Sequence, residues 1–331
     1  MRALLLLAVL LLPAAAHAQA FTFFALGDMP YAEADRPRVD SLIALINAAD
    51  PAFTIHVGDT KSGGSPCTDA IIERSKAQLD SFAGALIYSV GDNEWTDCHR
   101  RGMDPNERLA FVRRLHFPTA QSLGQRPITL ERQADVMPQY ATYVENSRWR
   151  FNNILFVAVH IPGSNNNKPS TIFPGDEAEF AARDAANQAW IADSFATAAR
   201  EGAAGIVFAY QADMWEAEVP RDPARSGFTA TLANFATGAR AFGKPVLLIH
   251  GDSHRLVIDK PIVDSTGATV ANAVRLMVMG EKEVHAVRVT VDPARPGLFT
   301  CTPLLVPDNP VGAASVQAGT SNCDGTPRTQ P

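Results

Sequence analysis

The sequence predicts an α/β fold in which parallel strands alternate with helices. Three short apolar runs near the N-terminus each end in Gly-Asp, at Asp28, Asp59 and Asp92. The intervals between these aspartates are 31 and 33 residues, about the length of a strand–helix–strand unit. A fourth apolar run, Pro245 to His250, leads into Asp252. We therefore expect parallel strands joined by right-handed crossovers, with their carboxyl ends at one edge of a sheet.

Helices are predicted between these runs because apolar residues recur at three- and four-residue intervals. The pattern covers Arg36 to Asn47, where Pro51 then stops it, and Thr68 to Ala83. The stretch Asp104 to Ser147 is polar and interrupted by proline, with one predicted helix at Glu107 to Leu115. We interpret this stretch as a loop or cap over the edge that carries the aspartates.

The second half of the chain repeats the alternation of strands and helices. Strands are predicted at Ile154 to His160 and Gly205 to Tyr210, and helices at Asp176 to Glu201 and Phe228 to Ala241. Later segments are predicted as short antiparallel strands of a second sheet: Leu256 to Ile258, Val274 to Met279 and Val284 to Val291. Residues 301–331 are punctuated by Pro and Gly and are predicted to form an irregular tail.

The first twenty residues have the pattern of a signal peptide. Arg2 precedes the apolar stretch Leu4 to Leu12, and the small-residue cleavage site is Ala16-His17-Ala18 or Ala18-Gln19-Ala20. The apolar stretch is far shorter than the roughly 20 residues of a membrane span, and no other segment is long enough. We expect a periplasmic or secreted protein with one domain over residues 21–300.

Cysteine content agrees with an oxidising compartment, because Cys67, Cys98, Cys301 and Cys323 form an even set. Three pairings are formally open to four cysteines. Cys67 and Cys98 each follow a Gly-Asp turn by a few residues, so we favour a bridge between them. Cys301 would then pair with Cys323.

Bulk composition excludes some classes of partner. The net charge of −6 gives no basic surface for nucleic acid. Apolar residues make up 46% of the 331 residues, enough for the core of one large domain or two small ones. No heptad pattern predicts an oligomeric state.

The predicted strand ends bring together carboxylates and imidazoles. Asp28, Asp59, Asp92 and Asp252 would converge at one edge of the sheet with His250 and His254. Crowded carboxylates repel one another unless cations lie between them. The sequence therefore predicts a metal centre.

The order and spacing of these turns resemble the calcineurin-like metallophosphoesterase superfamily. Its blocks are a strand-terminal Asp motif, Gly-Asp, Gly-Asn-His-Asp/Glu, a lone His and Gly-His-x-His. The corresponding blocks here are Gly27-Asp28-Met29-Pro30, Gly58-Asp59-Thr60-Lys61, Gly91-Asp92-Asn93-Glu94 and Gly251-Asp252-Ser253-His254. The resemblance covers about Phe21 to Val291. It implies a four-layer α-β-β-α sandwich of two mixed sheets, with a dinuclear site at the carboxyl ends of the strands.

Several positions depart from the pattern of the superfamily. Pro30 replaces the His of the first block, and Asp92 and Asn93 stand where Asn and the general-acid His are usual. Gln211 lies nearest the position of the lone His, with Asp213 close by. Asp252 replaces the first His of the last block, and His254 keeps the second. His250 is an additional candidate ligand.

The resemblance implies two divalent metal ions bridged by Asp59. Asp28 and His254 would complete the shell of one ion, and Asp92 or Asn93 with Asp252 that of the other. Such an oxygen-rich set favours Mn²⁺ or Mg²⁺, with Ca²⁺ or Zn²⁺ as alternatives.

By the same resemblance, the protein would hydrolyse the mono- or diester of a small phosphorylated substrate with a metal-activated water. Asn93 and Glu94 are the candidate catalytic residues, Glu94 either as an acid for the leaving group or as a hydrogen-bond acceptor within the turn. Candidate substrate-binding residues are Lys61, Gln211 and His160. Lys61 could equally be an ordinary surface lysine, and His160 could form a hydrogen bond with a carboxylate that binds metal. The run Gly163 to Asn167 could contact substrate, although Asn-rich turns also form for backbone reasons.

Two other classes of function remain open from the sequence. Pro30 and Asn93 remove one metal ligand and the usual acid, so a catalytically degenerate protein that binds metal or a phosphorylated ligand is one alternative. A structural Ca²⁺ site in an exported binding protein is the other.

Overall fold

The computed structural model describes residues 19–318, 322 and 323. The predicted signal peptide lies outside the described residues, apart from Gln19 and Ala20. Among the described residues, no helix is long and apolar enough to cross a membrane.

Twelve strands of the described chain form two sheets. The five-stranded sheet has the order β12 (Phe299–Leu304), β11 (Ala286–Val291), β1 (Phe21–Leu26), β2 (Thr54–His56) and β3 (Leu86–Tyr88). The seven-stranded sheet has the order β4 (Glu131–Arg132), β5 (Ser147–Phe151), β6 (Ile154–Ala158), β7 (Gly205–Ala209), β8 (Val246–His250), β10 (Ala273–Met277) and β9 (Val257–Asp259). Strands β1, β2 and β3 are parallel, and so are β6, β7, β8 and β10, which confirms the predicted parallel core of each half.

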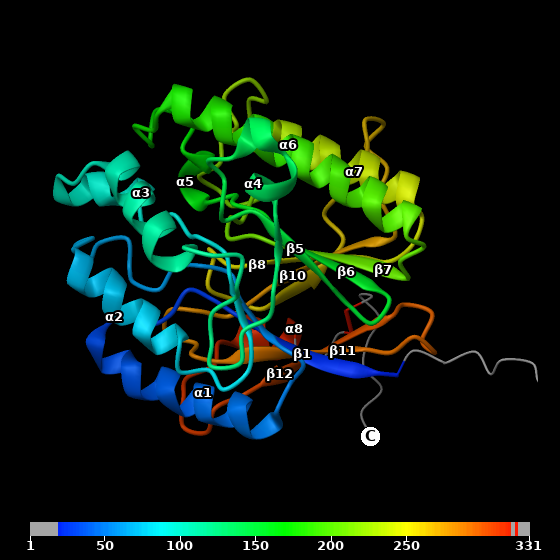
Figure 1. The fold of residues 1–331 in the computed structure, drawn as a ribbon, viewed down its shortest axis with the longest axis horizontal. Helices are drawn as coiled ribbons and strands as arrows, with labels where there is room; N and C mark the ends of the chain where they lie inside the picture. Colours follow the sequence, from blue (N-terminus) through cyan, green and yellow to red (C-terminus); the bar gives the residue numbers. More distant parts are fainter. Residues whose placement is uncertain (1–18, 319–321, 324–331) are drawn as a thin grey trace, which may run out of the picture.

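Helices cover the outer faces of both sheets, so the molecule has four layers (Figure 1). On the five-stranded sheet lie α1 (Arg36–Ala49), α2 (Asp69–Leu79) and α3 (Pro105–His116). On the seven-stranded sheet lie α6 (Glu177–Arg200) and α7 (Thr229–Phe242). The core between the sheets is aromatic and aliphatic, with Phe23, Phe53 and Phe156 in mutual contact. The predicted four-layer sandwich of two mixed sheets is confirmed.

Shorter elements connect these layers. They are η1 (Glu33–Asp35), η2 (Thr96–Arg101), α4 (Gln133–Val136), η3 (Pro138–Tyr140), α5 (Gly163–Asn166) and α8 (Ala313–Ala318). The long helix α6 begins where the Asp176 carboxylate accepts hydrogen bonds from the backbone of Ala178 and Glu179, at 2.9 and 3.1 Å. Such a cap satisfies backbone N–H groups that have no partner within the helix.

The late strands differ from the prediction of a separate antiparallel sheet. β9 and β10 join the seven-stranded sheet, where β10 runs parallel to β8, and β11 joins the five-stranded sheet beside β1. The prediction of an irregular tail from residue 301 is also wrong, because β12 pairs with β11 through residue 304. Burial of Phe299 and Cys301 on one side of β12 explains this pairing.

Strand β5 begins at Ser147, the last residue of the stretch predicted as a loop or cap, and continues through residues for which no element was predicted. Its residues alternate in character, since Trp149 and Phe151 pack into the core while Arg148 and Arg150 make ion pairs. Such alternation is typical of a strand, although no strand was predicted here.

Both predicted disulfides are present. Cys67 pairs with Cys98, and Cys301 with Cys323.

Candidate metal centre

The four aspartates lie in the turns that follow β1, β2, β3 and β8. Three of these turns need a left-handed backbone at the aspartate, with φ of 55° at Asp28, 58° at Asp59 and 81° at Asp252. Preceding glycines make room for the carboxylates of neighbouring turns. A Cβ on Gly91 would lie 2.0 Å from Asp59 Oδ1, and one on Gly251 would lie 2.0 Å from Asp28 Oδ2. Close packing of the turns therefore explains why Gly-Asp recurs.

The carboxylates converge as predicted from the strand ends. Oxygen atoms of Asp59, Asp92 and Asp252 all lie within 4.8 Å of one another. Asp28 joins this cluster, because its Oδ1 accepts a hydrogen bond of 2.9 Å from the backbone of Asp252. Two buried oxygens in the cluster, Asp28 Oδ2 and Asp92 Oδ1, have no hydrogen-bond partner. A buried carboxylate oxygen without a donor is costly, and a bound cation would satisfy it.

The electrostatics of the cluster also call for positive charge. Burial, followed by the charge of Asp92, raises the pKa of Asp59 and of Asp252 well above its usual value. Burial likewise raises the pKa of Asp28 well above its usual value. Carboxylates in this state release their protons readily only when cations replace them. Hard oxygen donors at this density fit divalent cations.

Tyr31, which the sequence motifs did not single out, also lies in the site. Its phenol oxygen lies 2.9 Å from His254 Nε2 and donates a hydrogen bond of 2.9 Å to Asp59 Oδ2. His254 Nε2 is in turn 3.8 Å from Asp28 Oδ1. Tyr31 thus places an oxygen beside the turn in which Pro30 has no ligand atom. Its position three residues after Asp28 was the available signal.

Amide side chains fill the space between the carboxylates. Asn93 Nδ2 donates to Asp59 Oδ2 at 2.7 Å, and Gln211 Nε2 donates to the same oxygen at 3.2 Å. Gln211 also donates to Asp252 Oδ1 at 3.0 Å, which links the turns of the two sheets. The structure therefore brings both predicted residues, Asn93 and Gln211, into the cluster.

The side chains of Glu94 and Lys61 both hydrogen-bond to the backbone of the loops around the site. The carboxylate of Glu94 is fully buried and accepts hydrogen bonds from the backbone of Asp59, Thr60 and Gly91. These contacts are the ones expected of the alternative in which Glu94 accepts hydrogen bonds within the turn. Lys61 Nζ is held by the carbonyls of Ser62 and Ser65, at 3.0 and 3.2 Å.

Two predicted histidines point away from the carboxylate cluster. His160 Nδ1 lies 2.8 Å from Glu145 Oε1, so this ring binds a carboxylate outside the cluster. His250 stacks on Tyr210, with ring centroids 5.4 Å apart, because strand alternation turns it toward the helix-covered face of β8. Neither histidine lines the cavity described next.

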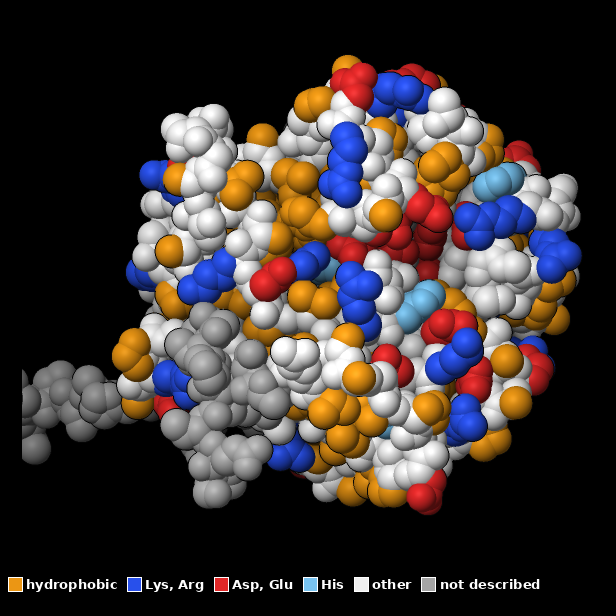
Figure 2. Space-filling model, turned by 180° about the vertical axis from the view of Figure 1, so that it is seen from behind, with side chains coloured by type: hydrophobic (Ala, Val, Ile, Leu, Met, Phe, Trp, Pro, Cys, Tyr) orange, Lys and Arg blue, Asp and Glu red, His pale blue; other side chains and the backbone are white. Residues whose placement is uncertain are grey.

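A cavity of about 220 Å³ opens above the cluster. Figure 2 shows a hollow on one face of the molecule in which acidic side chains gather. The cavity is lined by Tyr31, Asp59, Gly63, Gly64, Asp92, Asn93, Asp97, Arg100, Ser164, Phe173, Glu216, Glu218, Asp252 and His254. The predicted cap, Asp104 to Ser147, contributes none of these residues, so the loops around residues 63, 97, 164 and 216 form the walls instead.

One wall contains a left-handed turn of four consecutive residues. Ser164, Asn165, Asn166 and Asn167 have φ between 48° and 59°. Asparagine tolerates this conformation better than most residues, which agrees with the backbone reading of the run. Side-chain hydrogen bonds stabilise this left-handed conformation, since Asn165 binds three backbone groups and Arg183 binds Asn166. The turn places Ser164 Oγ between Asp92 Oδ2 and Asp97 Oδ1, at 2.7 and 2.9 Å.

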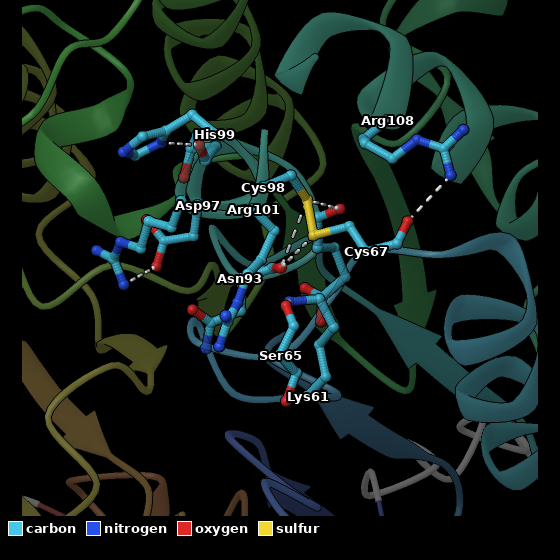
Figure 3. The surroundings of a disulfide bond; sticks show 12 residues. Lys61, Ser65, Cys67, Asn93, Asp97, Cys98, His99, Arg101 and Arg108 are labelled. Carbon is cyan, nitrogen blue, oxygen red and sulfur yellow. Dashed lines mark hydrogen bonds and ion pairs between the residues drawn. A yellow bond between two sulfur atoms is a disulfide. The ribbon is translucent and has the colours of Figure 1, made fainter. Parts of the chain in front are cut away.

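The Cys67–Cys98 disulfide joins two loops that reach the cavity. Figure 3 shows Asn93 and Asp97 beside the bridge, with Lys61 and Ser65 on the other loop. Cys67 Sγ lies 3.6 Å from the carbonyl oxygen of Asn93. The bridge therefore fixes the backbone of Asn93 relative to the loop that follows Asp59.

Comparison with known proteins identifies the fold. No family model and no curated protein sequence matches the chain. Among solved structures, a dimetal phosphatase from Danio rerio is 13% identical, with a TM-score of 0.50 over 82% of this chain and 95% of that one. GAP50, the anchor in the inner membrane complex of Plasmodium, is 9% identical, with a TM-score of 0.53 over 88% and 86%.

A third similar structure is larger than this chain. Purple acid phosphatase PPD1 from yellow lupin seeds is 11% identical, with a TM-score of 0.55, and covers 96% of this chain. The chain spans 58% of the length of that phosphatase. The two phosphatases share the arrangement of sheets and helices described above, and the chain therefore has the calcineurin-like metallophosphoesterase fold.

Proposed function

We propose that this protein is an exported, metal-dependent phosphoesterase that hydrolyses phosphate mono- or diesters. The observation that carries the proposal is the cluster of Asp28, Asp59, Asp92 and Asp252 at the floor of an open cavity, with two buried oxygens that lack partners. The fold is that of phosphatases that use two metal ions, which supports the same reaction.

The chain's own residues supply ligands and orientation. Asp59 is central, since its oxygens are shared by Tyr31, Asn93 and Gln211, and Asp28 with His254 and Asp92 with Asp252 flank it. Two divalent ions held there, with Mn²⁺ or Mg²⁺ favoured, would activate a water and neutralise phosphoryl oxygens.

Asn93 would contribute by hydrogen bonding and not by proton transfer. It lines the cavity, and its amide can donate a hydrogen bond but cannot release a proton. We therefore expect esters with acidic alcohols, such as aryl phosphates, to react faster than alkyl phosphates, because their leaving groups need less help from an acid.

Export is supported by the two disulfides and by the pattern of residues 1–20. Disulfides persist in oxidising compartments such as the periplasm or the extracellular space. We propose that the mature chain starts near Phe21 and functions there as one domain on a small phosphorylated substrate.

Hydrolysis of 4-nitrophenyl phosphate by the mature protein tests the proposal. Activity should require added Mn²⁺ or Mg²⁺ and should be lost with a chelator. Asp92→Asn should lose most of the activity, whereas Asp40→Asn, an exposed change on α1, is the matched control. Activity that persists in the chelator, or in Asp92→Asn, would contradict a metal-dependent reaction at this cluster.

A further inference from the structure

The cavity has one wall whose negative charge is not neutralised by any of the described residues. Glu216 and Glu218 line it, and neither carboxylate makes an ion pair or hydrogen bond with any part of the chain that the structure describes. Asp97 also lines the cavity, but it forms an ion pair with Arg100 at 2.7 Å. Among the described residues that line the cavity, no lysine or other arginine accompanies Arg100. We call Glu216 and Glu218 the acidic wall.

The acidic wall shares its cavity with aspartates whose contacts indicate a bound ligand. Asp92 is 6% exposed, lines the same cavity, and its Oδ1 has no partner. Two divalent cations at the floor would balance the four aspartates there, and the charge of the acidic wall would remain. Phe173 completes the lining with an aromatic face, which attracts cations as well as apolar groups.

We propose that the acidic wall selects phosphate esters whose alcohol portion carries a positive charge, such as an amine. This inference rests on the proposed function, which places the phosphate on the floor and directs the alcohol portion toward the walls. An anionic alcohol portion is repelled by Glu216 and Glu218, because the guanidinium that could offset them is held by Asp97. A cationic portion is attracted by both carboxylates and by the face of Phe173.

Three aryl phosphates that differ only in the para substituent test the proposal on the metal-loaded mature protein. They are the 4-(aminomethyl)phenyl, 4-ethylphenyl and 4-(carboxymethyl)phenyl esters, which are cationic, neutral and anionic. Assays at pH 8, about one unit above the pKa of about 7 to which burial raises Glu216, keep its carboxylate ionised. The ratio of kcat/KM between the cationic and the neutral ester should be about tenfold at low salt and should shrink as salt screens the charges.

Variants locate the source of the preference. In Glu216→Gln/Glu218→Gln the ratio should fall to about one, because charge is removed while size is kept. Glu73→Gln/Glu177→Gln removes two exposed carboxylates away from the cavity and should keep the ratio of the wild type. A wild-type ratio of one or less, or a ratio that survives in Glu216→Gln/Glu218→Gln, would overturn the proposal.

Failure of the proposed function is distinguishable from failure of this inference. If none of the three esters is hydrolysed, the phosphoesterase proposal fails, and calorimetric binding of the same esters then tests the acidic wall alone. Tighter binding of the cationic ester, lost in Glu216→Gln/Glu218→Gln, would still support selection by the wall. Equal affinities for the cationic and neutral esters would overturn it.

Discussion

Two groups of buried carboxylates in this molecule differ in what neutralises them. In the first, Asp28, Asp59, Asp92 and Asp252 receive hydrogen bonds only from neutral donors among the residues that the structure describes. Burial, followed by repulsion between the carboxylates, raises the pKa of Asp28, Asp59 and Asp252. In the second, Glu145 accepts hydrogen bonds from Arg113 and His160.

The second group is complete within the protein. Arg113 and the hydrogen bond from His160 outweigh burial and hold the pKa of Glu145 well below its usual value. Glu179 behaves in the same way beside Arg183, 2.7 Å away, and its pKa is also lowered although burial opposes the shift. A buried carboxylate that pairs with an arginine of the same chain stabilises the fold. A cluster of buried carboxylates without such a partner needs a bound cation to neutralise it.

Glu145→Gln should have the largest effect on stability. The change leaves the guanidinium of Arg113 buried without its counter-charge, which typically costs about 3–5 kcal/mol. Denaturant unfolding measures the loss. Asp135→Asn removes the exposed pair with Arg132 and should cost less than about 1 kcal/mol. Equal losses in the two variants would show that the two pairs do not differ as described.

Gln211→Leu should weaken cation binding about 10- to 100-fold. Gln211 holds Asp59 and Asp252 in place, and loss of such hydrogen-bond partners typically has this effect on metal affinity. Titration with Mn²⁺ measures the affinity. Gln188→Leu, on α6 where it contacts α7, removes hydrogen bonds with Asp184, Thr231 and Asn234 and should leave the affinity unchanged. An unchanged affinity in Gln211→Leu would remove this residue from the site.

The stabilisation by a divalent cation should grow as pH rises above about 4, the usual pKa of an aspartate. Without a cation, the raised pKa values of Asp28, Asp59 and Asp252 keep protons bound in the native state that the unfolded chain has released. The free energy of unfolding therefore falls with rising pH, by about 1.4 kcal/mol per pH unit for each such proton, and a cation removes this loss.

Buried histidines such as His56 and His116 have lowered pKa values, and so destabilise the native state as pH falls below about 6.5. They do so with and without the cation, and their effect cancels in the difference. Thermal unfolding with and without excess Mn²⁺ gives that difference. A stabilisation that stays constant or declines with pH would mean that the carboxylates do not exchange protons for metal.

Local sequence was sufficient to predict the cluster because its geometry is local. Each aspartate follows a strand by a short turn, and glycines such as Gly91 and Gly251 are required by the neighbouring carboxylates. The parallel strands β1, β2 and β3 then bring three of the turns together, whereas Asp252 follows β8 of the other sheet and joins them through the packing of the two sheets. The same reasoning gave the helices and the Cys67–Cys98 bridge.

Residues whose role depends on distant contacts could not be predicted in this way. His160 binds Glu145 instead of a cluster carboxylate, and nothing in the spacing of the two residues indicates that pairing. Residues in the walls of the cavity include Glu216 and Phe173, which lie in irregular loops, and Arg100, which lies in the short helix η2, and none of these segments has a periodic apolar pattern. His250 is different, because Ile249 faces the core between the sheets and strand alternation could have placed His250 on the opposite face.

Metal content is the most direct test of the contrast between the two groups. The mature protein, Asp59→Asn and Glu145→Gln would be incubated with Mn²⁺, freed of excess ion and analysed by mass spectrometry. We expect one to two equivalents of metal in the wild type and in folded Glu145→Gln, and little in Asp59→Asn, whose affinity should fall at least about 100-fold. No bound metal in the wild type, or equal amounts in the wild type and Asp59→Asn, would contradict the assignment of the aspartate cluster as a metal centre.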